Sequence, residues 1–518
     1  MNSFPFLTTL TLIPLIGGVI VACLNPERKQ FARRLAIVFS LAALAFAVAL
    51  WFSFKADGGL QFVERAAWIP SLGIEYFLAA DGLSLLMVLL AAIIIPFAML
   101  SSAKIDKNPK LYFSLFLFLE AGLFGTFTAL NFFHWFLFWE LSLIPAFFLI
   151  KVWGGKERTR AAYQFFIYTM VGSVAMLLSF LAIHAATGTW DFIALAEIAG
   201  KGELKSALFA KLGGTFFESE QTLAMFIFVG VFLGFAVKVP LIPFHTWLPA
   251  AYAEAPTGTS MVLTGAMSKM GVYGFIRILL PIFPEQMREV LTPLLILAVA
   301  TIVFSAFAAL AQKDLKRMAA YSSINHLGYC LLGIFAAAQI TGVGTDSATE
   351  KSAALSGVML QMFNHGLTAS ALFCFIGLIE QRSGGLRGID DFGGLRKVAP
   401  AFCGLLGITL FASLGLPGLN GFIGEFLIFK GTFPLVPWAA AISTVGLLVT
   451  AVLLLTILQR VFTGPLRKEW SGWTDLTSRE RLTIAPVIAL MFILGIFPQI
   501  VIGVINPTVL NLIKQLSL

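Results

Sequence analysis

The chain has 518 residues, of which 58% are hydrophobic and only 12% are charged. A soluble protein of this length needs a much larger polar surface, so the composition excludes that class and predicts an integral membrane protein. The net charge of +8 comes from Lys and Arg in short loops, without the basic patch interleaved with aromatic residues that nucleic-acid binding requires. No nucleic-acid partner is therefore expected.

Runs of about 18 or more mainly apolar residues, the length that crosses a bilayer, recur along the whole chain. We therefore predict an all-α integral membrane fold of about fourteen transmembrane helices. The expected spans are residues 5–23, 34–53, 82–102, 111–130, 132–150, 164–186, 222–248, 259–281, 291–311, 319–337, 353–379, 400–430, 435–462 and 482–504.

The distribution of Lys and Arg between successive loops predicts the orientation. Most of these cations lie in alternate loops, at residues 24–33, 103–110, 151–163, 312–318, 380–399 and 460–481. Cationic loops face the cytoplasm, so both termini are expected on the non-cytoplasmic side. No Arg- and Ser-rich transit segment precedes the first span, which we interpret as a retained helix, and this favours a bacterial inner membrane.

Two of the expected spans contain helix-breaking residues at membrane depth. Residues 234–249 include Pro240 and Pro243, and residues 413–425 include Pro417 among several glycines. Proline removes a helical N–H and crowds the preceding turn, so helices seven and twelve should be broken. Unwound backbone at that depth is tolerated only beside protein or internal water.

The two breaks are separated by five spans, which is typical of an inverted repeat in transporters. We predict two inverted five-helix repeats, helices 4–8 and helices 9–13. The expected organisation is N-terminal helices one to three, a first repeat, a second repeat, and a C-terminal loop with helix fourteen. These units cover residues 1–110, 111–281, 291–462 and 463–518.

Ionisable residues inside the spans are the candidate functional groups, because each costs roughly 2.5–3.5 kcal/mol to insert. The set comprises Glu140, Lys238, Lys269, His326, His365 and Glu425, with His245 as a further possibility just after the first break. Burial favours the neutral form of Lys and Glu, whereas a nearby opposite charge favours the charged form, so a change of pairing moves protons between them. Histidine titrates readily enough to join such a proton relay.

Structural interpretations of the same residues remain open. Glu140 and Lys238 are also compatible with a purely structural ion pair, and Lys269 with a side chain that snorkels to the interface. His326 and His365 are compatible with hydrogen bonding between helices, and His245 with a bond to a carbonyl freed by the break. We predict no metal site, because the five histidines have no i, i+3 or i, i+4 spacing and the four cysteines are scattered. We also predict no nucleotide site, because the sequence contains no phosphate-binding loop motif.

Several charged motifs resemble, in order and over nearly the whole chain, the antiporter-like membrane subunits of the proton-pumping NADH:quinone oxidoreductase, respiratory complex I. The motifs are Phe138-Trp139-Glu140-Leu141, the segment from Lys238 through His245-Thr246-Trp247-Leu248-Pro249, Glu254-Ala255-Pro256-Thr257 leading to Lys269, and Leu416-Pro417-Gly418 leading to Glu425. Within that family the M-type subunit carries Glu at the position of Glu425, whereas the sister L and N subunits commonly carry Lys. The chain therefore resembles the M-type subunit most.

The resemblance implies a relay with Glu140 and Lys238 as a modulating ion pair and Lys269 as the central proton carrier. His326 and His365 would connect Lys269 to Glu425, which would face the exit half-channel. The resemblance also implies that the chain is a subunit of a translocase with no redox centre of its own, since flavin, iron–sulfur clusters and quinone belong to partner subunits. Expected partners are the other membrane-arm subunits, especially the L and N sisters, together with the bilayer.

The sequence departs from the family at Ala250-Ala251-Tyr252, where relatives often have Asp-Ala-His after Trp-Leu-Pro. This puts in doubt any proton path that uses those polar groups. Three rival functions remain open. The first is a subunit of a multisubunit cation/proton antiporter. The second is a module of a membrane hydrogenase, ferredoxin-linked or inorganic-carbon-uptake complex, and the third is a scaffold whose buried charges only fix helix packing.

Overall fold

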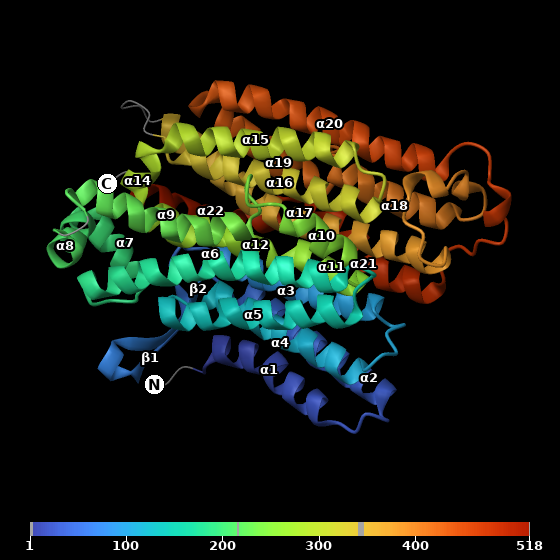
Figure 1. Ribbon diagram of the computed structural model, residues 1–518, viewed down its shortest axis with the longest axis horizontal. Coiled ribbons are helices and arrows are strands. Elements are labelled where there is room, and N and C mark those ends of the chain that lie inside the picture. The colour runs from blue at the N-terminus through green and yellow to red at the C-terminus, as the bar shows by residue number, and fades with distance from the viewer. Residues whose placement is uncertain (1–3, 215–216, 340–345, 517–518) are drawn as a thin grey trace.

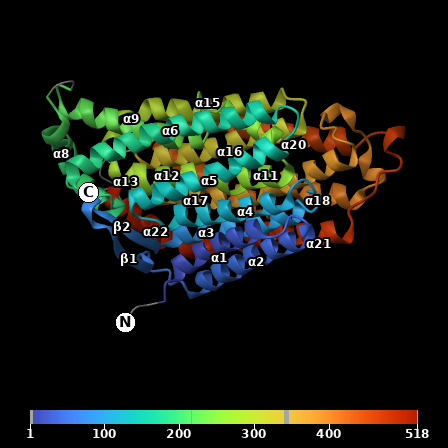
Figure 2. The same ribbon diagram turned by 60° about the horizontal axis from the view of Figure 1, so that its bottom comes forward.

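The computed structural model describes residues 4–214, 217–339 and 346–516 of the chain. Long helices run side by side along the longest axis of the molecule, and both termini lie at the same end in both views (Figures 1 and 2). The loops that precede α18 and α21 lie at the opposite end. The chain thus crosses the bundle repeatedly, with the basic loops gathered away from the termini.

The N-terminal part consists of three helices and one β-hairpin. Its elements are α1 (Phe6–Cys23), α2 (Lys29–Ser53), β1 (Gln61–Ile69), β2 (Ile74–Ala80) and α3 (Gly82–Ser101). The antiparallel hairpin turns at Gly73, whose φ of 64° suits a residue without a Cβ. The hairpin is an addition to the mostly helical fold that the sequence predicted, and residues 61–80 lie outside the predicted spans, at the terminal end of the bundle (Figure 1).

The middle of the chain forms the helices that carry Glu140, Lys238 and Lys269. They are α4 (Pro109–Thr128), α5 (Phe132–Trp153), α6 (Arg158–Thr187), α7 (Phe192–Gly200), α8 (Glu203–Leu212), α9 (Glu220–Lys238), α10 (Trp247–Glu254), α11 (Thr257–Val262), α12 (Lys269–Gly274), α13 (Leu280–Ile282) and α14 (Pro284–Glu289). Short α7 and α8 lie at the terminal end. Two π-helical turns, Leu263–Met267 and Phe275–Leu279, flank α12.

The remaining helices complete the bundle. They are α15 (Leu291–Leu310), α16 (Leu315–Ala337), α17 (Asp346–Arg382), α18 (Pro400–Ser413), α19 (Asn420–Leu435), α20 (Pro437–Phe462), α21 (Ser478–Ile496) and α22 (Gln499–Leu516). The most buried of the long helices is α17, with its whole apolar stretch inside the protein. It therefore forms the centre around which the other helices pack.

Both predicted helix breaks are present. The first separates α9 from α10 between Lys238 and Trp247, and the second separates α18 from α19 between Ser413 and Asn420. Gly415 has a φ of 79°, which Gly adopts without the penalty of a side chain. Gly421 packs so tightly that an added Cβ would overlap the carbonyl oxygen of Ala412. The arrangement of the two units as an inverted repeat stays a prediction.

Ten of the described helices are long and apolar enough to cross a membrane. The predicted spans 259–281, 319–337 and 400–430 are not among them. A π-helical turn divides the first, polar residues lower the hydropathy of the second, and the second break divides the third. The predicted span 482–504 is wrong as a single helix, since α21 and α22 meet at a bend of 66° beside Pro498. The chain is a multi-pass membrane protein, and the total of fourteen spans stays a prediction.

Candidate functional site

Four of the predicted residues form one continuous row of contacts inside the protein. Lys269 Nζ lies 2.9 Å from His365 Nδ1, and the ring centroids of His365 and His326 are 5.0 Å apart. His326 Nδ1 lies 3.0 Å from the Oε1 of Glu425. All four side chains are buried, with Lys269 fully so and Glu425 6% exposed. The fold thus brings α12, α17, α16 and α19 together at an ionisable row.

The backbone around Lys269 supplies further acceptors for its ammonium group. Nζ donates to the carbonyl oxygen of Thr264 at 2.5 Å and lies 3.4 Å from Ser268 Oγ. Thr264 belongs to the π-helical turn that precedes α12, and such turns are frequent at functional sites. The Oγ1 of Thr264 also shares a 2.9 Å hydrogen bond with Ser323 on α16. Lys269 is therefore held from its own helix while it contacts His365 across the interface.

The second break determines where Glu425 lies. Asn364 on α17 donates to the carbonyl oxygen of Asn420 at 2.6 Å, and Asn420 donates back to the carbonyl oxygen of Asn364 at 3.2 Å. These reciprocal bonds fasten the start of α19 to α17. Glu425 follows within the first turns of α19, close enough to the break that an added Cβ on Gly415 would meet its Oε2 at 2.9 Å.

Gln361 and Ser413 were not predicted, although both contact the row. Gln361 Nε2 donates to Glu425 Oε1 at 3.2 Å and lies 3.4 Å from His326 Nδ1. Ser413 Oγ lies 3.4 Å from His326 Nε2. Gln361 precedes His365 by four residues on one helix, so the i, i+4 spacing was a usable signal. Ser413 is the last residue before the second break, which was a weaker one.

Glu140 and Lys238 approach each other without a direct ion pair. Both residues are described by the structure and form no ion pair within 4.0 Å, although the two groups interact electrostatically. Lys238 Nζ instead lies 4.9 Å from the ring centroid of Trp139, a cation–π arrangement. The Oε1 of Glu140 is buried with no hydrogen-bond partner. The role of this pair as a modulator of the relay stays a prediction.

A small void connects the surroundings of Lys238 to those of Lys269. Its volume is about 10 Å³, close to the space that one water needs, and Lys238 and Ser268 both line it. Gly271 lets α12 lie close to the end of α9, since a Cβ at this position would meet the Cβ of Lys238 at 3.1 Å. Ser268 in turn contacts Lys269. The first break and the central lysine are therefore neighbours.

His245 lies apart from the row. Its ring packs against Phe304 at 5.7 Å and Tyr321 at 6.4 Å between centroids, and its Nδ1 is buried without a hydrogen-bond partner. The structure gives it no polar contact with the other predicted residues. In the described part of the chain, no group of three or more His, Cys, Asp or Glu is arranged to hold a metal ion.

A second buried charge pair lies nearer the terminal end. Arg277 donates to Asp81 Oδ2 at 2.5 Å and to Ser84 Oγ at 3.3 Å. Ser84 Oγ lies 3.1 Å from the Tyr273 hydroxyl, which donates to the carbonyl oxygen of Phe127 at 3.0 Å. Asp81 and Arg277 also line a cavity of about 700 Å³. This chain of bonds ties the helix that carries Lys269 to α3 and α4.

Comparisons with known proteins agree with the fold. A family model described as "NADH:quinone oxidoreductase/Mrp antiporter, TM" matches residues 129–451. The chain is 37% identical to NADH-quinone oxidoreductase subunit M of Rhodobacter capsulatus, over 98% of this chain and 96% of that protein. It is also 34% identical to the Mycobacterium tuberculosis protein of the same name, over 99% of this chain and 94% of that protein.

A solved structure of respiratory complex I from Thermus thermophilus contains a chain that superposes with a TM-score of 0.83 and 28% identity, covering 98% of this chain and 99% of that one. The Mrp complex from Dietzia sp. shares the fold, with a TM-score of 0.79 at 22% identity over 97% of this chain and 52% of the other. The chain therefore belongs to the NADH:quinone oxidoreductase/Mrp antiporter transmembrane family, and within it to the relatives named NADH-quinone oxidoreductase subunit M.

Proposed function

We propose that this chain carries protons across a bacterial inner membrane as the M-type membrane-arm subunit of an NADH:quinone oxidoreductase. The observation that supports the proposal most is the buried row Lys269–His365–His326–Glu425, whose first and last contacts are 2.9 Å and 3.0 Å long. Ionisable groups at membrane depth cost free energy, and a row of them in mutual contact is what a proton relay requires. A scaffold needs neither the two imidazoles nor their order.

Protons would move along the row by successive hydrogen-bond exchange. An ammonium at Lys269 donates to His365 Nδ1, and transfer of that proton leaves a neutral amine and an imidazolium. The imidazolium passes its other proton toward His326, whose Nδ1 faces the Glu425 carboxylate. Each transfer shifts one charge by about one side chain. Moving that charge fully across a potential of 100 mV takes about 2.3 kcal/mol, which the partner subunits' redox reaction would supply.

Glu140 and Lys238 would regulate this transfer. Because Lys238 shares a small void with Ser268, which contacts Lys269, a change in the Glu140–Lys238 distance alters the electrostatic field at the central lysine. Flavin, iron–sulfur clusters and quinone would lie in partner subunits, and the L and N sisters would flank this chain in the membrane arm. The loops richest in Lys and Arg would face the cytoplasm, which places both termini on the other side.

The test is the ratio of protons pumped to electrons transferred in the complete complex reconstituted in vesicles. Lys269→Ala should lower that ratio, because it removes the donor to His365. Lys430→Ala, at an exposed lysine of α19, is the matched control and should keep the ratio. A normal ratio in the Lys269 variant would overturn the proposal. Purification with antiporter subunits in place of quinone-reductase subunits would favour the rival exchanger.

A further inference from the structure

Two solvent-open cavities meet at one carboxylate on the end of the molecule that carries the basic loops. One has a volume of about 320 Å³ and the other about 310 Å³, and Glu254, the last residue of α10, lines both. The side chain of Glu254 is 9% exposed, so it is largely buried at the edge of both cavities. On the basis of the proposed function, we propose that Glu254 is the residue at which protons are taken up from this side.

The backbone of the loop between α5 and α6 packs directly against the carboxylate of Glu254. Its Oε2 accepts a hydrogen bond from the backbone N–H of Glu157 at 2.9 Å, and an added Cβ on Gly155 would meet that oxygen at 2.6 Å. The N–H of Gly155 donates to the carbonyl oxygen of Glu254 at 2.8 Å. The loop between α5 and α6 therefore wraps around Glu254, and only a small residue leaves room for the side chain.

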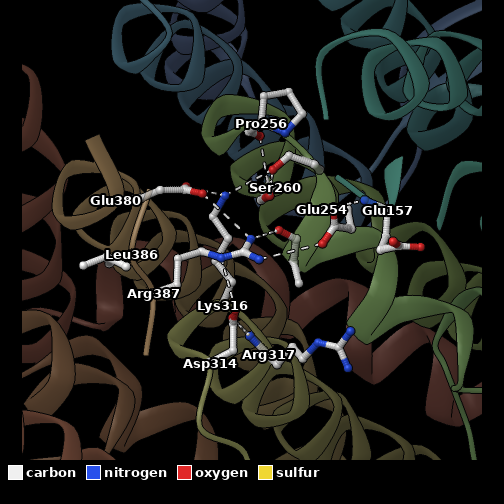
Figure 3. A network of polar contacts seen from close by, with 12 residues as sticks. Glu157, Glu254, Pro256, Ser260, Asp314, Lys316, Arg317, Glu380, Leu386 and Arg387 are labelled. Carbon is white, nitrogen blue, oxygen red and sulfur yellow. Dashed lines mark hydrogen bonds and ion pairs between the residues drawn. The ribbon is translucent and has the colours of Figure 1, made fainter. Parts of the chain in front are cut away.

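Basic and acidic groups from other elements face the same carboxylate. Arg387 lies 3.7 Å from Glu254 Oε1, and it also pairs with Asp314 at 3.1 Å and Glu380 at 3.8 Å. Lys316 pairs with Glu380 at 2.7 Å (Figure 3). Glu157, Arg160, Arg317 and Lys104 complete the charged lining of the two cavities. Glu254 is thus the carboxylate of this network that contacts both cavities, with Arg387 near one of its oxygens.

The proposed path runs from Glu254 along α10. Gln164 on α6 lines the 310 Å³ cavity and donates to the carbonyl oxygen of Thr246, an exposed residue of the first break, at 3.2 Å. The next residue, Phe165, lines the void that also contains Lys238 and Ser268. Glu254 and Trp247 are the two ends of α10, so about 10 Å of helix separates the surface from this void.

Aromatic rings close this path in the structure. Phe165 and Trp247 lie 5.3 Å apart between centroids, and both line the void beside Lys238. Small movements of these rings would let water connect the cavity at Glu254 to Lys238 and then to Ser268 and Lys269. Ala250 and Glu254, which are four residues apart on α10, both line the 310 Å³ cavity, and Glu254 supplies the carboxylate on that face of the helix.

The experiment measures proton pumping by the complete complex in vesicles. Glu254→Gln keeps the size of the side chain and an oxygen for the Glu157 N–H, but it cannot carry a proton. The pumping rate should fall roughly tenfold, a conservative share of the rate that a positioned proton-transfer group supplies. Glu254→Asp, which retains a carboxylate, should recover part of it. Asp390→Asn, an exposed acid at the same end paired with Arg460, should pump normally.

Gln164→Leu provides a second variant that leaves Glu254 untouched. It makes the next step of the path apolar, so it should also slow pumping. Normal pumping in either Glu254→Gln or Gln164→Leu overturns the proposed path, and equal loss in Glu254→Gln and Glu254→Asp also overturns it, because Glu254 then has a structural role only. Lys269→Ala is measured alongside. If Lys269→Ala fails to pump while Glu254→Gln pumps normally, the uptake path is wrong and the relay stands.

Discussion

His326 Nδ1 lies 3.0 Å from Glu425 Oε1. The imidazole belongs to the continuous helix α16, and the carboxylate belongs to α19, which begins after the second helix break. The contact joins α16 to α19 across 99 residues of chain. Gln361 on α17 donates to the same carboxylate oxygen, which fixes its position from a third helix. Any movement of the second break therefore changes the last contact of the row directly.

Glu425→Gln should abolish proton release at the end of the row with little loss of stability. The amide oxygen still accepts from His326 Nδ1, so the hydrogen bond persists at a cost of about 1 kcal/mol, but the side chain no longer binds and releases a proton. The measurement is the proton-to-electron ratio of the reconstituted complex, with Glu469→Gln at an exposed position of the short 3-10 helix Lys468–Trp470 as control. An unchanged ratio would remove Glu425 from the relay.

Gly421→Ala should destabilise the second break. The added Cβ overlaps the carbonyl oxygen of Ala412, and overpacking of this kind costs typically about 1–3 kcal/mol. Gly404→Ala on α18, where a Cβ meets nothing within 4 Å, is the matched control. Thermal unfolding of the purified complex in detergent should show a lower midpoint for the first variant alone. Equal unfolding midpoints for the two variants would mean that the backbone at the break shifts to accommodate the added Cβ without a loss of stability.

Asp81→Asn should destabilise the protein more than any exposed ion-pair substitution. It leaves the guanidinium of Arg277 buried and uncompensated, and removal of one partner of a buried pair costs roughly 3–5 kcal/mol. Asp390→Asn breaks the exposed pair with Arg460 and should cost at most about 1 kcal/mol. Exchange of the two charges, Asp81→Arg with Arg277→Asp, should recover part of the loss. Similar unfolding midpoints for the two single variants would contradict the assignment.

The hydrogen bonds that the Asp475 carboxylate accepts from backbone N–H groups, outside the membrane, should depend on pH. Burial by itself raises the pKa of this carboxyl, but hydrogen bonds from the N–H groups of Leu476, Ala401 and Phe402 outweigh it and hold the pKa below its ordinary value. A lowered folded-state pKa stabilises the protein above the unfolded value, about 3.9, and that stabilisation is lost as the pH falls through the folded value.

The Asp475→Asn variant should therefore be less stable than the parent at neutral pH, by about 1–2 kcal/mol at this partly exposed site. The difference should shrink as the pH falls below about 3.9, where the parent carboxyl also becomes neutral. Unfolding midpoints of both proteins measured over a pH series provide the test. A difference that stays constant with pH would show that the charge of Asp475 contributes nothing.

Hydropathy and backbone chemistry are local properties, so the sequence by itself determined the membrane class, most of the spans, both helix breaks and the set of ionisable residues. Pro240 and Pro243 end α9 whatever the tertiary fold around them, because proline has no N–H to donate to a helical hydrogen bond. Lys269 stands out for a similar reason, since a charge inside a long apolar run is costly in any fold. The terminal hairpin and the bend beside Pro498 were missed, because the scan followed apolar length and not strand pairing or interhelical angle.

Only the tertiary structure decided which of these residues meet. Lys269 and His365 are 96 residues apart, and their 2.9 Å contact depends on how α12 packs against α17. The same packing leaves Glu140 and Lys238 without a direct ion pair and excludes His245 from the row. It also places Glu254 between two cavities. Distances of this kind are set by the interlocking of side chains on neighbouring helices, which no single stretch of sequence contains.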